Sequence, residues 1–492
     1  MQYPGFIGGT YTNSSISVEG ERCVNFFPEV VESGRGKNNV FLCGTPGLRL
    51  RAVLPDRPVR GIYATDDRLF VVAGATMYEV FSDWTYSALA GAIIRDDKPA
   101  QMFGNGKQIF VVAGGMGYLA QIDVAPYTVV PVVPAVTGGY LDTYFIAQQP
   151  GTANFNLSGS LDGINWDPLD FAVKESDAFR IASMLTDHQL LVLFGSRTTE
   201  FWEDAGDPDF PLQRISGGVL EQGCGAAYSP AKLGPNNFAW LGMTAHGEGM
   251  VWKAQGYQPQ RISNHCVEAA LQSYRKAGAR LADAVGVPKQ HGGHQFYELH
   301  IPGANAGRGA TWVYDDTATA QLGSPQWHEK AAWDTEHGEW KGAVDRPHAY
   351  AFGQHLTGDA LSGNLYEESL DYFDAAGAAI RRMRSSPHLH GDGNMVYFGA
   401  LWVDAAVGGL SNLLDGAGNP RPPQMMRQIS NDGGYTWGPE LWVGMGMTGQ
   451  YKARARWTRS GRARDRCDRI VVTDPIRWVL INAHIDVEIG TA

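Results

Sequence analysis

The chain has 492 residues with 40 Lys and Arg against 51 Asp and Glu, so its formal net charge is −11. A hydrophobic content of 44% supports a packed core and excludes a disordered chain, and the surplus of acid counts against high-affinity, sequence-independent binding of nucleic acid. No apolar run approaches the roughly 20 residues of a membrane helix, and the five scattered cysteines form no CxxC pair that would predict a zinc knuckle or a disulfide framework.

A repeat of about forty residues follows an N-terminal segment, 1–49, which we expect to form an extended arm or β segment. The stretch DDRLFVVAGATMYEV (66–80) is matched forty residues later by GKQIFVVAGGMGYLA (106–120). Each reads as a short apolar strand, a glycine turn and a second strand. Related hairpin patterns recur at 140–166, 187–203, 235–254, 294–315 and 347–368.

These units predict an all-β fold with a β-propeller of six or seven blades over residues 50–380. A period near forty residues with paired strands is typical of propellers, in which each blade buries its faces against its neighbours. The strands are continuous apolar runs, which fits burial on both faces. The alternative is a set of unrelated hairpins in one large sandwich.

One segment, at about 266–285, breaks the β pattern. Val267, Leu271, Tyr274 and Leu281 recur at helical spacing among good helix formers. We expect one helix inserted between blades, where it covers a blade edge; contact with a second subunit is the alternative.

The pattern changes again after residue 380. Longer strands with clearer alternation occur at 394–408, 424–432, 434–444, 450–458 and 468–490. Residues 381–492 are therefore predicted to form a C-terminal antiparallel domain resembling a β-sandwich. A further hypothesis is that this domain lends a strand to close the propeller.

Two stretches resemble the Asp-box turn of sialidases and related propellers. An aspartate in such a turn accepts hydrogen bonds from backbone N–H groups, a glycine supplies a positive φ and a tryptophan packs under the hairpin. These turns are folding devices and carry no catalysis. The residues are Ser430, Asp432, Gly434, Thr436 and Trp437 in SNDGGYTW, and Ser160, Asp162 and Trp166 in the shorter SLDGINW.

Enzyme signatures are weak throughout the sequence. The arginine motif of a sialidase is not matched by FRIAS (179–183), and FGNGKQ (103–108) lacks the spacing of a phosphate loop. HGGH (291–294) with His300, and HLHGD (388–392), lack further ligands at a readable metal-binding spacing. We predict no catalytic residues, no metal ligands and no cofactor.

Positive charge gathers near the C-terminus. Between Lys452 and Arg469, eight basic residues accompany two acidic ones, a local charge of +6 that leaves −17 for the rest of the chain. In YKARARW every second residue is basic, so on a strand these cations share one face, and RSGRAR is expected to reverse the chain into a returning strand. The predicted two-strand basic face comprises Lys452, Arg454, Arg456, Arg459, Arg462, Arg464 and Arg466.

Three hypotheses compete for this basic face. The cations form a solvated face that pairs with local carboxylates such as Asp465, Asp468 and Asp474, or they form a salt-bridge surface with another subunit or protein, or they contact nucleic-acid phosphates. The strongly acidic remainder of the chain disfavours the third hypothesis, because it repels DNA.

Several stretches, taken in order, resemble the packaged-DNA stabilisation proteins that form the tail hub, or nozzle, of short-tailed phages (podoviruses). They are GGTY (8–11), CVNFFPE (23–29), GTPGLRL (44–50), RGIYATDDRLFVVAGATMYEV (60–80), LLVLFGSRTTEFWE (190–203), ISNHCVEAALQSY (262–274) and the C-terminal SNDGGYTWG and RARWTRSGRARDRCDRIVVTDPIRWVLINAHIDVE. The resemblance covers essentially the whole chain.

The resemblance implies a non-enzymatic virion protein of the phage tail, made in the host cytoplasm. It implies a ring, usually a homohexamer, below the portal and its adaptor, which extends and helps close the DNA channel during retention and ejection. Partners implied are the adaptor, tailspikes or tail fibres, a tail needle or plug, and double-stranded DNA in non-specific passage. The alternatives are a carbohydrate-active, sialidase-like propeller and a generic protein-binding propeller scaffold.

Overall fold

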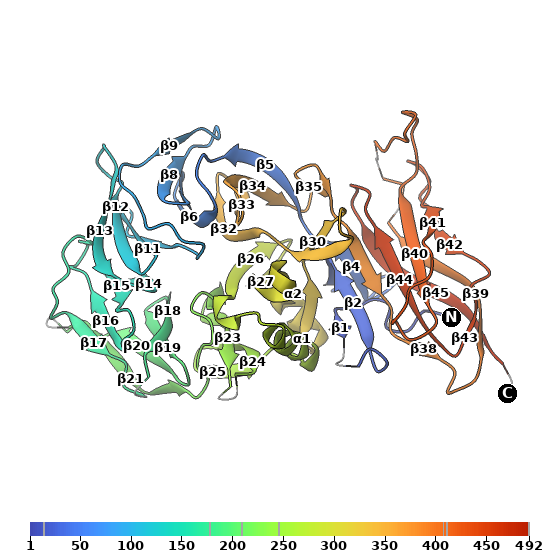
Figure 1. Cartoon of the computed structure of the whole chain (residues 1–492), viewed down its shortest axis with the longest axis horizontal. Coiled ribbons are helices and arrows are strands. Elements are labelled where there is room, and N and C mark those ends of the chain that lie inside the picture. The colour runs from blue at the N-terminus through green and yellow to red at the C-terminus, as the bar shows by residue number, and fades with distance from the viewer. Residues whose placement is uncertain are drawn as a thin grey trace.

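Each forty-residue unit folds into a small antiparallel sheet, and these sheets stand around a common axis as the blades of a wheel (Figure 1). The computed structural model describes residues 1–12, 15–176, 179–207, 210–244, 247–406, 408–409 and 412–490. Within these residues the wheel has seven blades, the upper of the two numbers predicted. A β-sandwich lies beside the wheel.

Blades 1 to 5 are four-stranded antiparallel sheets whose strand order follows the chain, because turns or loops join each strand to its neighbour in the sheet. Blade 1 contains β6 (Val59–Thr65), β7 (Arg68–Ala73), β8 (Thr76–Val80) and β9 (Tyr86–Ala88); blade 2 contains β10 (Gln101–Gly104), β11 (Gln108–Ala113), β12 (Met116–Gln121) and β13 (Thr128–Pro134). Blade 3 contains β14 (Gly138–Leu141), β15 (Tyr144–Gln148), β16 (Asn154–Leu157) and β17 (Phe171–Val173). Blade 4 contains β18 (Ile181–Asp187), β19 (Leu190–Gly195), β20 (Thr199–Asp204) and β21 (Leu212–Leu220); blade 5 contains β22 (Ala231–Gly234), β23 (Asn237–Met243), β24 (Gly249–Gln255) and β25 (Gln258–Arg261).

The continuous apolar strands are explained by packing on both faces of a blade. In β7, Phe70 and Val72 join the apolar cluster shared with blade 2. Leu69 and Val71, which alternate with them, join the cluster shared with blade 7 on the other side. Each such side chain contributes about 1.5–3 kcal/mol when it is fully buried, so a strand without polar alternation is the expected sequence for a blade interior.

Blade 6 is built from consecutive strands, whereas blade 7 combines strands from distant parts of the chain. Blade 6 contains β26 (Val285–His291), β27 (His294–Ile301), β28 (Ala310–Asp315) and β29 (Gln326–Glu329). Blade 7 contains β32 (Asp345–Ala351), β33 (Gln354–Asp359) and β34 (Asn364–Ser369), followed by β5 (Gly47–Val53). Its sheet continues into β35 (Asp374–Ala375) and β36 (Ala378–Ala379).

The wheel is closed by β5, from the N-terminal side of the chain. This strand pairs antiparallel with β34, from Gly47 opposite Ser369 to Val53 opposite Asn364. The hypothesis that the C-terminal domain lends the closing strand is therefore wrong. Pairing the start of the propeller with its end converts an open row of blades into a ring. The fit is tight, since a Cβ on Gly47 would lie 2.5 Å from the carbonyl oxygen of Tyr372.

The sandwich consists of two antiparallel sheets. One contains β3 (Phe26–Val30), β4 (Val40–Gly44), β45 (Val479–Ile489) and β39 (Val396–Ala405), with β42 (Ala455–Trp457) and β43 (Gly461–Ala463) along β39. The other contains β2 (Gly20–Val24), β37 (Arg382–Ser385), β44 (Asp465–Val472), β40 (Gln424–Ser430) and β41 (Leu441–Gly444), with β1 (Tyr11–Thr12) on β2 and β38 (Leu389–His390) on β44. Of the predicted domain 381–492, residues 407, 410–411 and 491–492 lie outside the described residues.

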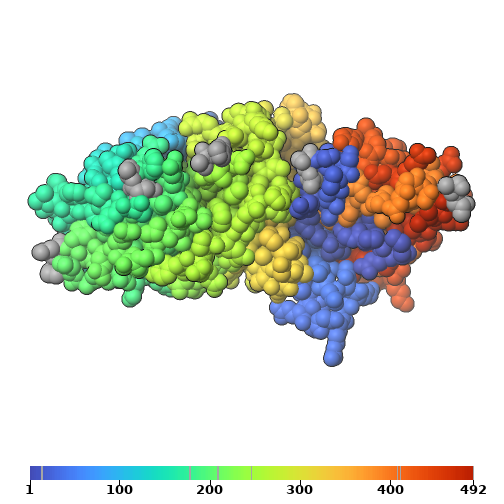
Figure 2. Space-filling model, turned by 90° about the horizontal axis from the view of Figure 1, so that it is seen from below, coloured from blue at the N-terminus to red at the C-terminus, as the bar shows by residue number. Residues whose placement is uncertain are grey.

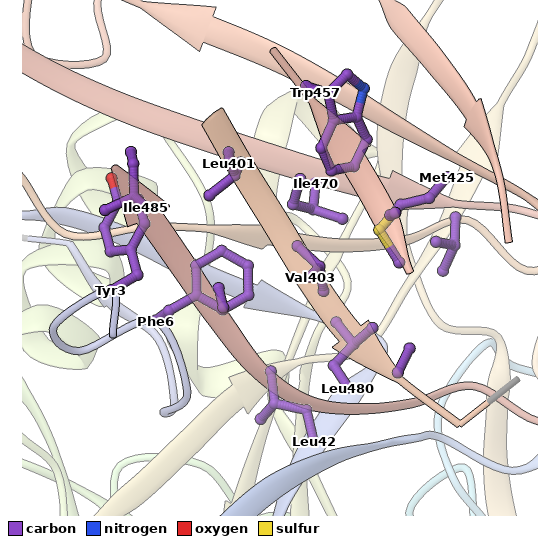
Figure 3. Close-up of a cluster of buried hydrophobic side chains, with 14 of the residues drawn as sticks. Tyr3, Phe6, Leu42, Leu401, Val403, Met425, Trp457, Ile470, Leu480 and Ile485 are labelled. Atoms are coloured by element: carbon purple, nitrogen blue, oxygen red, sulfur yellow. The ribbon is translucent and has the colours of Figure 1, made fainter. Parts of the chain in front are cut away.

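The N-terminal segment 1–49 is built into both halves of the molecule and does not stand apart as an arm. Strands β2 to β4 lie in the sandwich, whereas β5 lies in blade 7. Tyr3 and Phe6 insert among Leu401 and Ile485 in the core between the two sheets (Figure 3). The first residues of the chain therefore complete a core whose other members come mostly from its last hundred residues.

One sheet runs continuously from the propeller into the sandwich. Strand β29 of blade 6 pairs with β2 through Val24 and Glu329, and Arg22 donates to Glu329 across this junction at 2.6 Å. His294 of β27 also spans the junction, with its Nδ1 2.7 Å from Asp315 and its Nε2 3.0 Å from Glu29 of β3. The molecule is accordingly an elongated body with the wheel at one end and the sandwich at the other (Figure 2).

The inserted helix is shorter than expected. Helix α1 spans His265–Lys276, with Asn264 accepting a hydrogen bond from the N–H of Val267 as its N-cap. It ends before Gly278, whose φ of +97° is left-handed, and only the 3₁₀ turn Leu281–Asp283 follows. The helix packs on the apolar cluster shared by blades 5 and 6, consistent with its expected covering role.

The remaining elements are short. They are α2 (Ala304–Gly307), α3 (Asp316–Leu322) and the hairpin of β30 (Ala331–Asp334) and β31 (Glu339–Gly342). Among the described residues, no helix combines the length and the apolar character needed to cross a membrane.

Candidate functional site

The basic segment lies on the edge of the sandwich and differs from the predicted hairpin. Strands β42 and β43 do not pair with each other; both pair antiparallel with β39, Trp402 opposite Arg456 and Tyr397 opposite Arg462. The chain therefore continues in one direction along β39, with an interruption at Thr458–Ser460. Arg459 adopts a φ of +55°, and Ser460 donates its N–H to Gly399, which produces a bulge in place of the expected reversal.

Alternation along this interrupted strand separates apolar from basic side chains. Ala455, Trp457 and Ala463 are buried in the sandwich core, whereas Arg456 and Arg462 are exposed on the outer side. Lys452, Arg454, Arg459 and Arg464, which lie outside the two strands, are exposed as well. We call these six exposed cations the basic edge: Lys452, Arg454, Arg456, Arg459, Arg462 and Arg464.

Arg466 does not belong to the basic edge, which corrects the sequence prediction. It lies in β44 and is buried, with its guanidinium 3.9 Å from the ring centroid of Phe398. Its Nη2 donates to Oδ1 of Asn431 at 2.8 Å, and burial lowers the pKa of Arg466 to about 10. Strand β44 occupies the middle of the second sheet, so a side chain on its inner face has no access to solvent.

The carboxylates expected to neutralise the basic segment are engaged elsewhere. Asp465 accepts from His388 at 2.9 Å, Asp468 pairs with Arg427 at 2.7 Å, and Asp474 pairs with Arg421. Among the described residues, none of these three carboxylates forms an ion pair with the exposed cations of the basic edge, although those cations face solvent as the first hypothesis expects.

Within the basic edge, Arg454 has a local partner, Asp404, at 2.9 Å. In the part of the chain that the structure describes, no carboxylate lies within 4 Å of the cationic nitrogens of the other five cations. Five unpaired positive charges on one sheet edge are thus available to an external partner.

A shallow hollow of about 590 Å³ lies beside the basic edge. Arg459 and Arg462 line it together with Tyr397, Asp486 and Glu488. Both signs of charge and an exposed aromatic ring therefore occur on this surface, as is common where proteins contact one another.

A buried ion pair supports the basic edge from beneath. Arg427 of β40 and Asp468 of β44 are both fully buried, and Arg427 also donates to Oγ of Ser460 in the bulge at 2.8 Å. Asp468 accepts nothing from the basic edge, but its N–H donates to Ser386, which in turn contacts the hydroxyl of Tyr3. This network fixes the bulge relative to both sheets and so holds the exposed arginines in place.

The first Asp-box forms the turn after β40. Asp432 accepts from the N–H of Thr436 at 2.9 Å and from the hydroxyl of Ser430 at 2.7 Å, and Gly434 has a φ of +94°. Hydrogen bonds from Thr436 lower the pKa of Asp432 to about 2. Trp437 is half-buried and carries the guanidinium of Arg469 3.7 Å above its ring.

The second Asp-box lies between β16 and β17 of blade 3. Asp162 accepts from the N–H of Ile164 at 3.0 Å, and these hydrogen bonds lower its pKa. Ser160 donates to Thr143 and not to Asp162, so the turn is tighter than the first. Trp166 packs against Phe110 of blade 2 with ring centroids 5.4 Å apart.

The histidines of HGGH separate into different environments. His294 lies at the propeller–sandwich junction, and His300 contacts Glu298 at 3.3 Å. His291 instead meets His348 and His355 from blade 7. Sequence reasoning did not single out His348 and His355, because they lie more than fifty residues from HGGH and carry no local motif.

The fold and its surface define a class: a β-propeller joined through a shared sheet to a β-sandwich, with unpaired positive charge along one edge of the sandwich. The propeller model of the family described as bacteriophage P22 Gp10 matches residues 1–371, and the β-sandwich model of the same family matches residues 381–488. The chain belongs to this family of packaged-DNA stabilisation proteins, which are phage structural proteins.

Other comparisons add little. A search of curated proteins found no match. Among solved structures, the N-terminal domain of Nup159 is 9% identical with a TM-score of 0.40, covering 70% of this chain and 98% of that one. An exo-β-1,3-galactanase from Phanerochaete chrysosporium is 11% identical with a TM-score of 0.27, covering 89% of this chain and 99% of that one. Likenesses at these TM-scores carry no argument about fold or activity.

Proposed function

We propose that this chain is the nozzle, or hub, of a short phage tail, where six copies form a ring below the portal and its adaptor. The ring extends the DNA channel, helps to close it after packaging, and supports tailspikes or fibres and a tail needle. Its role is mechanical and involves no catalysis. The observation that carries the proposal is the match of both halves of the chain, 1–371 and 381–488, to one family of phage structural proteins.

The distribution of charge supports assembly through the basic edge. Five cations there have no ion-pair partner among the described residues, while the rest of the chain carries a large negative excess. A second copy of the chain, or an acidic adaptor, therefore offers the complementary surface. Complementary charge raises association rates and fixes orientation, and an acidic body repels DNA and lets it slide past without adhering.

The rigid junction supports a mechanical role. The blade 6 sheet continues into the sandwich through β2, and the N-terminus completes the sandwich core. Force applied to the propeller therefore reaches the sandwich through the Val24–Glu329 pairing, the Arg22–Glu329 ion pair and the contact of His294 with Glu29.

Charge reversal on the basic edge tests the assembly surface. The triple variant Arg456→Glu, Arg462→Glu and Arg464→Glu places like charges against an acidic partner, which costs several kcal/mol. Binding of the full-length chain to the portal–adaptor complex of the same phage should weaken at least about a hundredfold. Sedimentation velocity measures the binding, and negative-stain electron microscopy shows whether rings form.

A charge-matched control separates the surface from net charge. Arg57→Glu, Lys107→Glu and Arg180→Glu change the charge by the same amount at exposed positions on the propeller. The control should assemble as the wild type does. If the basic-edge variant also assembles normally, this surface is not the assembly interface. The tail location is tested separately by electron microscopy of virions that carry a tagged copy, and label away from the tail contradicts the proposed function itself.

A further inference from the structure

The interface between blades 6 and 7 is built differently from the other blade interfaces. Apolar clusters fill the six other contacts between neighbouring blades in the described residues. Between blades 6 and 7, two ammonium groups and three carboxylates are buried together: Lys289, Lys330, Glu298, Asp345 and Glu368. This group has a formal charge of −1 and no access to bulk solvent.

The ion pairs of this group are short and mutual. Lys289 lies 2.6 Å from Asp345 and 2.9 Å from Glu368, and Lys330 lies 3.0 Å from Glu298. Burial alone would lower the pKa of each lysine, but the surrounding carboxylates raise both pKa values. Each ammonium is thus satisfied, and the uncompensated charge in the group is negative.

Three histidines converge beside this ion group. His291 ends β26 of blade 6, while His348 in β32 and His355 in β33 come from blade 7. His355 pairs with Tyr350 across blade 7. Tyr350 is two residues after His348 on the same strand, so the rings of His348 and His355 lie on the same face of the sheet. The ring centroids of His291 and His355 are 4.4 Å apart.

The ring nitrogens face one another. His348 Nε2 lies 3.2 Å from His355 Nδ1, and one nitrogen from each of the three rings falls within 4.8 Å of the others. A metal that is bound tetrahedrally by imidazoles at about 2.0–2.1 Å holds their nitrogens about 3.4 Å apart. The His348–His355 pair, at 3.2 Å, is close to this spacing, and the His291 nitrogen lies within 4.8 Å of both.

The third ring, His291, lies between the histidine pair of blade 7 and the buried ion group. His291 Nε2 is buried without a hydrogen-bond partner among the described residues, and it lies 3.5 Å from the carboxylate of Glu368. Its contact with Glu368 is at the limit of hydrogen-bond distance, so a metal–ligand bond would give this nitrogen a stronger partner.

We propose that His291, His348 and His355 form a transition-metal site of the zinc class that joins blade 6 to the closing blade 7. Imidazole nitrogens select zinc, copper, nickel or cobalt over magnesium and calcium. The carboxylate of Glu368, 3.5 Å from His291 Nε2, favours a dication beside it. His355 is partly exposed, which gives the ion a path from solvent and leaves a fourth position for water.

The site has a structural consequence at the seam of the ring. Blade 7 contains β5, the strand that closes the wheel, so a metal between blades 6 and 7 supports the ring next to its closure. A bound metal stabilises the folded state in proportion to the logarithm of its free concentration. This inference is independent of the proposed role in the tail.

Metal titration of the full-length chain tests the proposal. The chelator-treated protein is titrated with ZnCl₂ by calorimetry, and its thermal unfolding midpoint is measured with and without zinc. One Zn²⁺ per chain should bind and raise the midpoint. His355→Gln, at a partly exposed position, should weaken binding at least about a hundredfold, and His291→Gln on the opposite blade should do the same.

Matched controls decide between this cluster and two others. His337→Gln alters an exposed group with Asp334 and Glu336, and His388→Gln alters a group with Asp465 and Cys467. Both controls should bind zinc as the wild type does. Absence of zinc binding to the wild type, or binding that survives His355→Gln and His291→Gln, would overturn the proposal. If a variant fails to fold, Co²⁺ binding still decides the question. The wild type should show the visible absorption of tetrahedral Co²⁺, and Zn²⁺ should abolish it by competition. His337→Gln and His388→Gln should retain this absorption.

Discussion

Replacing Arg384 with Met should release the N-terminus from the sandwich. Arg384 lies in β37 and is fully buried. Its guanidinium donates to the carbonyl oxygens of Gly5, Phe6 and Gly9 at 2.7–2.8 Å and pairs with Glu21. One side chain in the second sheet thus holds the first nine residues of the chain, including a member of the core.

The expected cost follows from what the substitution leaves behind. Removing one member of a buried ion pair costs about 3–5 kcal/mol, because the other charge loses its partner. The three carbonyl oxygens lose their donor, and each buried acceptor left unpaired adds about 1 kcal/mol or more. Met fills a similar volume, which limits any loss of packing. Because the Glu21 side chain is 18% exposed and water partly replaces its lost partner, the ion pair contributes less than the buried value, and we expect Arg384→Met to destabilise the folded sandwich by about 4–6 kcal/mol in total.

Urea titration followed by pulse proteolysis measures this loss, with mass spectrometry to follow the N-terminal peptide. Arg308→Met is the matched control, because Arg308 and Glu339 form an ion pair whose side chains are 40% and 45% exposed. Such a surface pair contributes about 1 kcal/mol or less. A loss below about 1 kcal/mol for Arg384→Met would show that the N-terminus is not held by these bonds.

Three further substitutions probe the junction, the closure and the ion group. Burial lowers the pKa of His294, but hydrogen bonds to its two carboxylate partners outweigh burial and raise this pKa overall. The charged His294 therefore stabilises the folded chain fully below the unfolded pKa of about 6.5. This stabilisation is lost as the pH rises through the folded pKa. The difference in unfolding free energy between the wild type and His294→Gln should therefore shrink as the pH rises above about 6.5; a difference that stays constant refutes the charged junction. Gly47→Ala should destabilise the closed wheel by about 1–3 kcal/mol in thermal unfolding, because its Cβ meets backbone atoms at 2.5 Å, whereas Gly416→Ala, with open space around it, should have little effect. Lys330→Met should cost about 3–5 kcal/mol in urea unfolding, because three buried carboxylates would share one ammonium, and a neutral result would mean that water enters the group.

The local pattern of the sequence predicts the blades well. The forty-residue repeat, the apolar runs and the glycine turns are properties of neighbouring residues, and the structure places a hairpin at each repeated unit. The propeller and the sandwich were both predicted in this way. The Asp-box at Asp432 depends on contacts within a few residues, so its turn could likewise be derived from the motif.

The sequence predictions were wrong where a residue's position is set by contacts with residues far away in the chain. The reversal expected at RSGRAR did not form, because Ser460 and its neighbours pair with Gly399 of β39 and not with the preceding strand. Arg466 was placed on the surface by its charge, but β44 lies in the middle of a sheet, where Phe398 and Asn431 accommodate a guanidinium.

The sequence by itself determined the kinds of building block, since strand, turn and helix preferences and the burial of apolar runs follow from short stretches of chain. Only the tertiary structure decided which blocks meet: that β5 closes the wheel, that Tyr3 completes the sandwich core, and that His291 faces His348 and His355. The physical reason is that such contacts join residues separated by tens to hundreds of positions. They exist only in the folded tertiary structure, and no local periodicity encodes them.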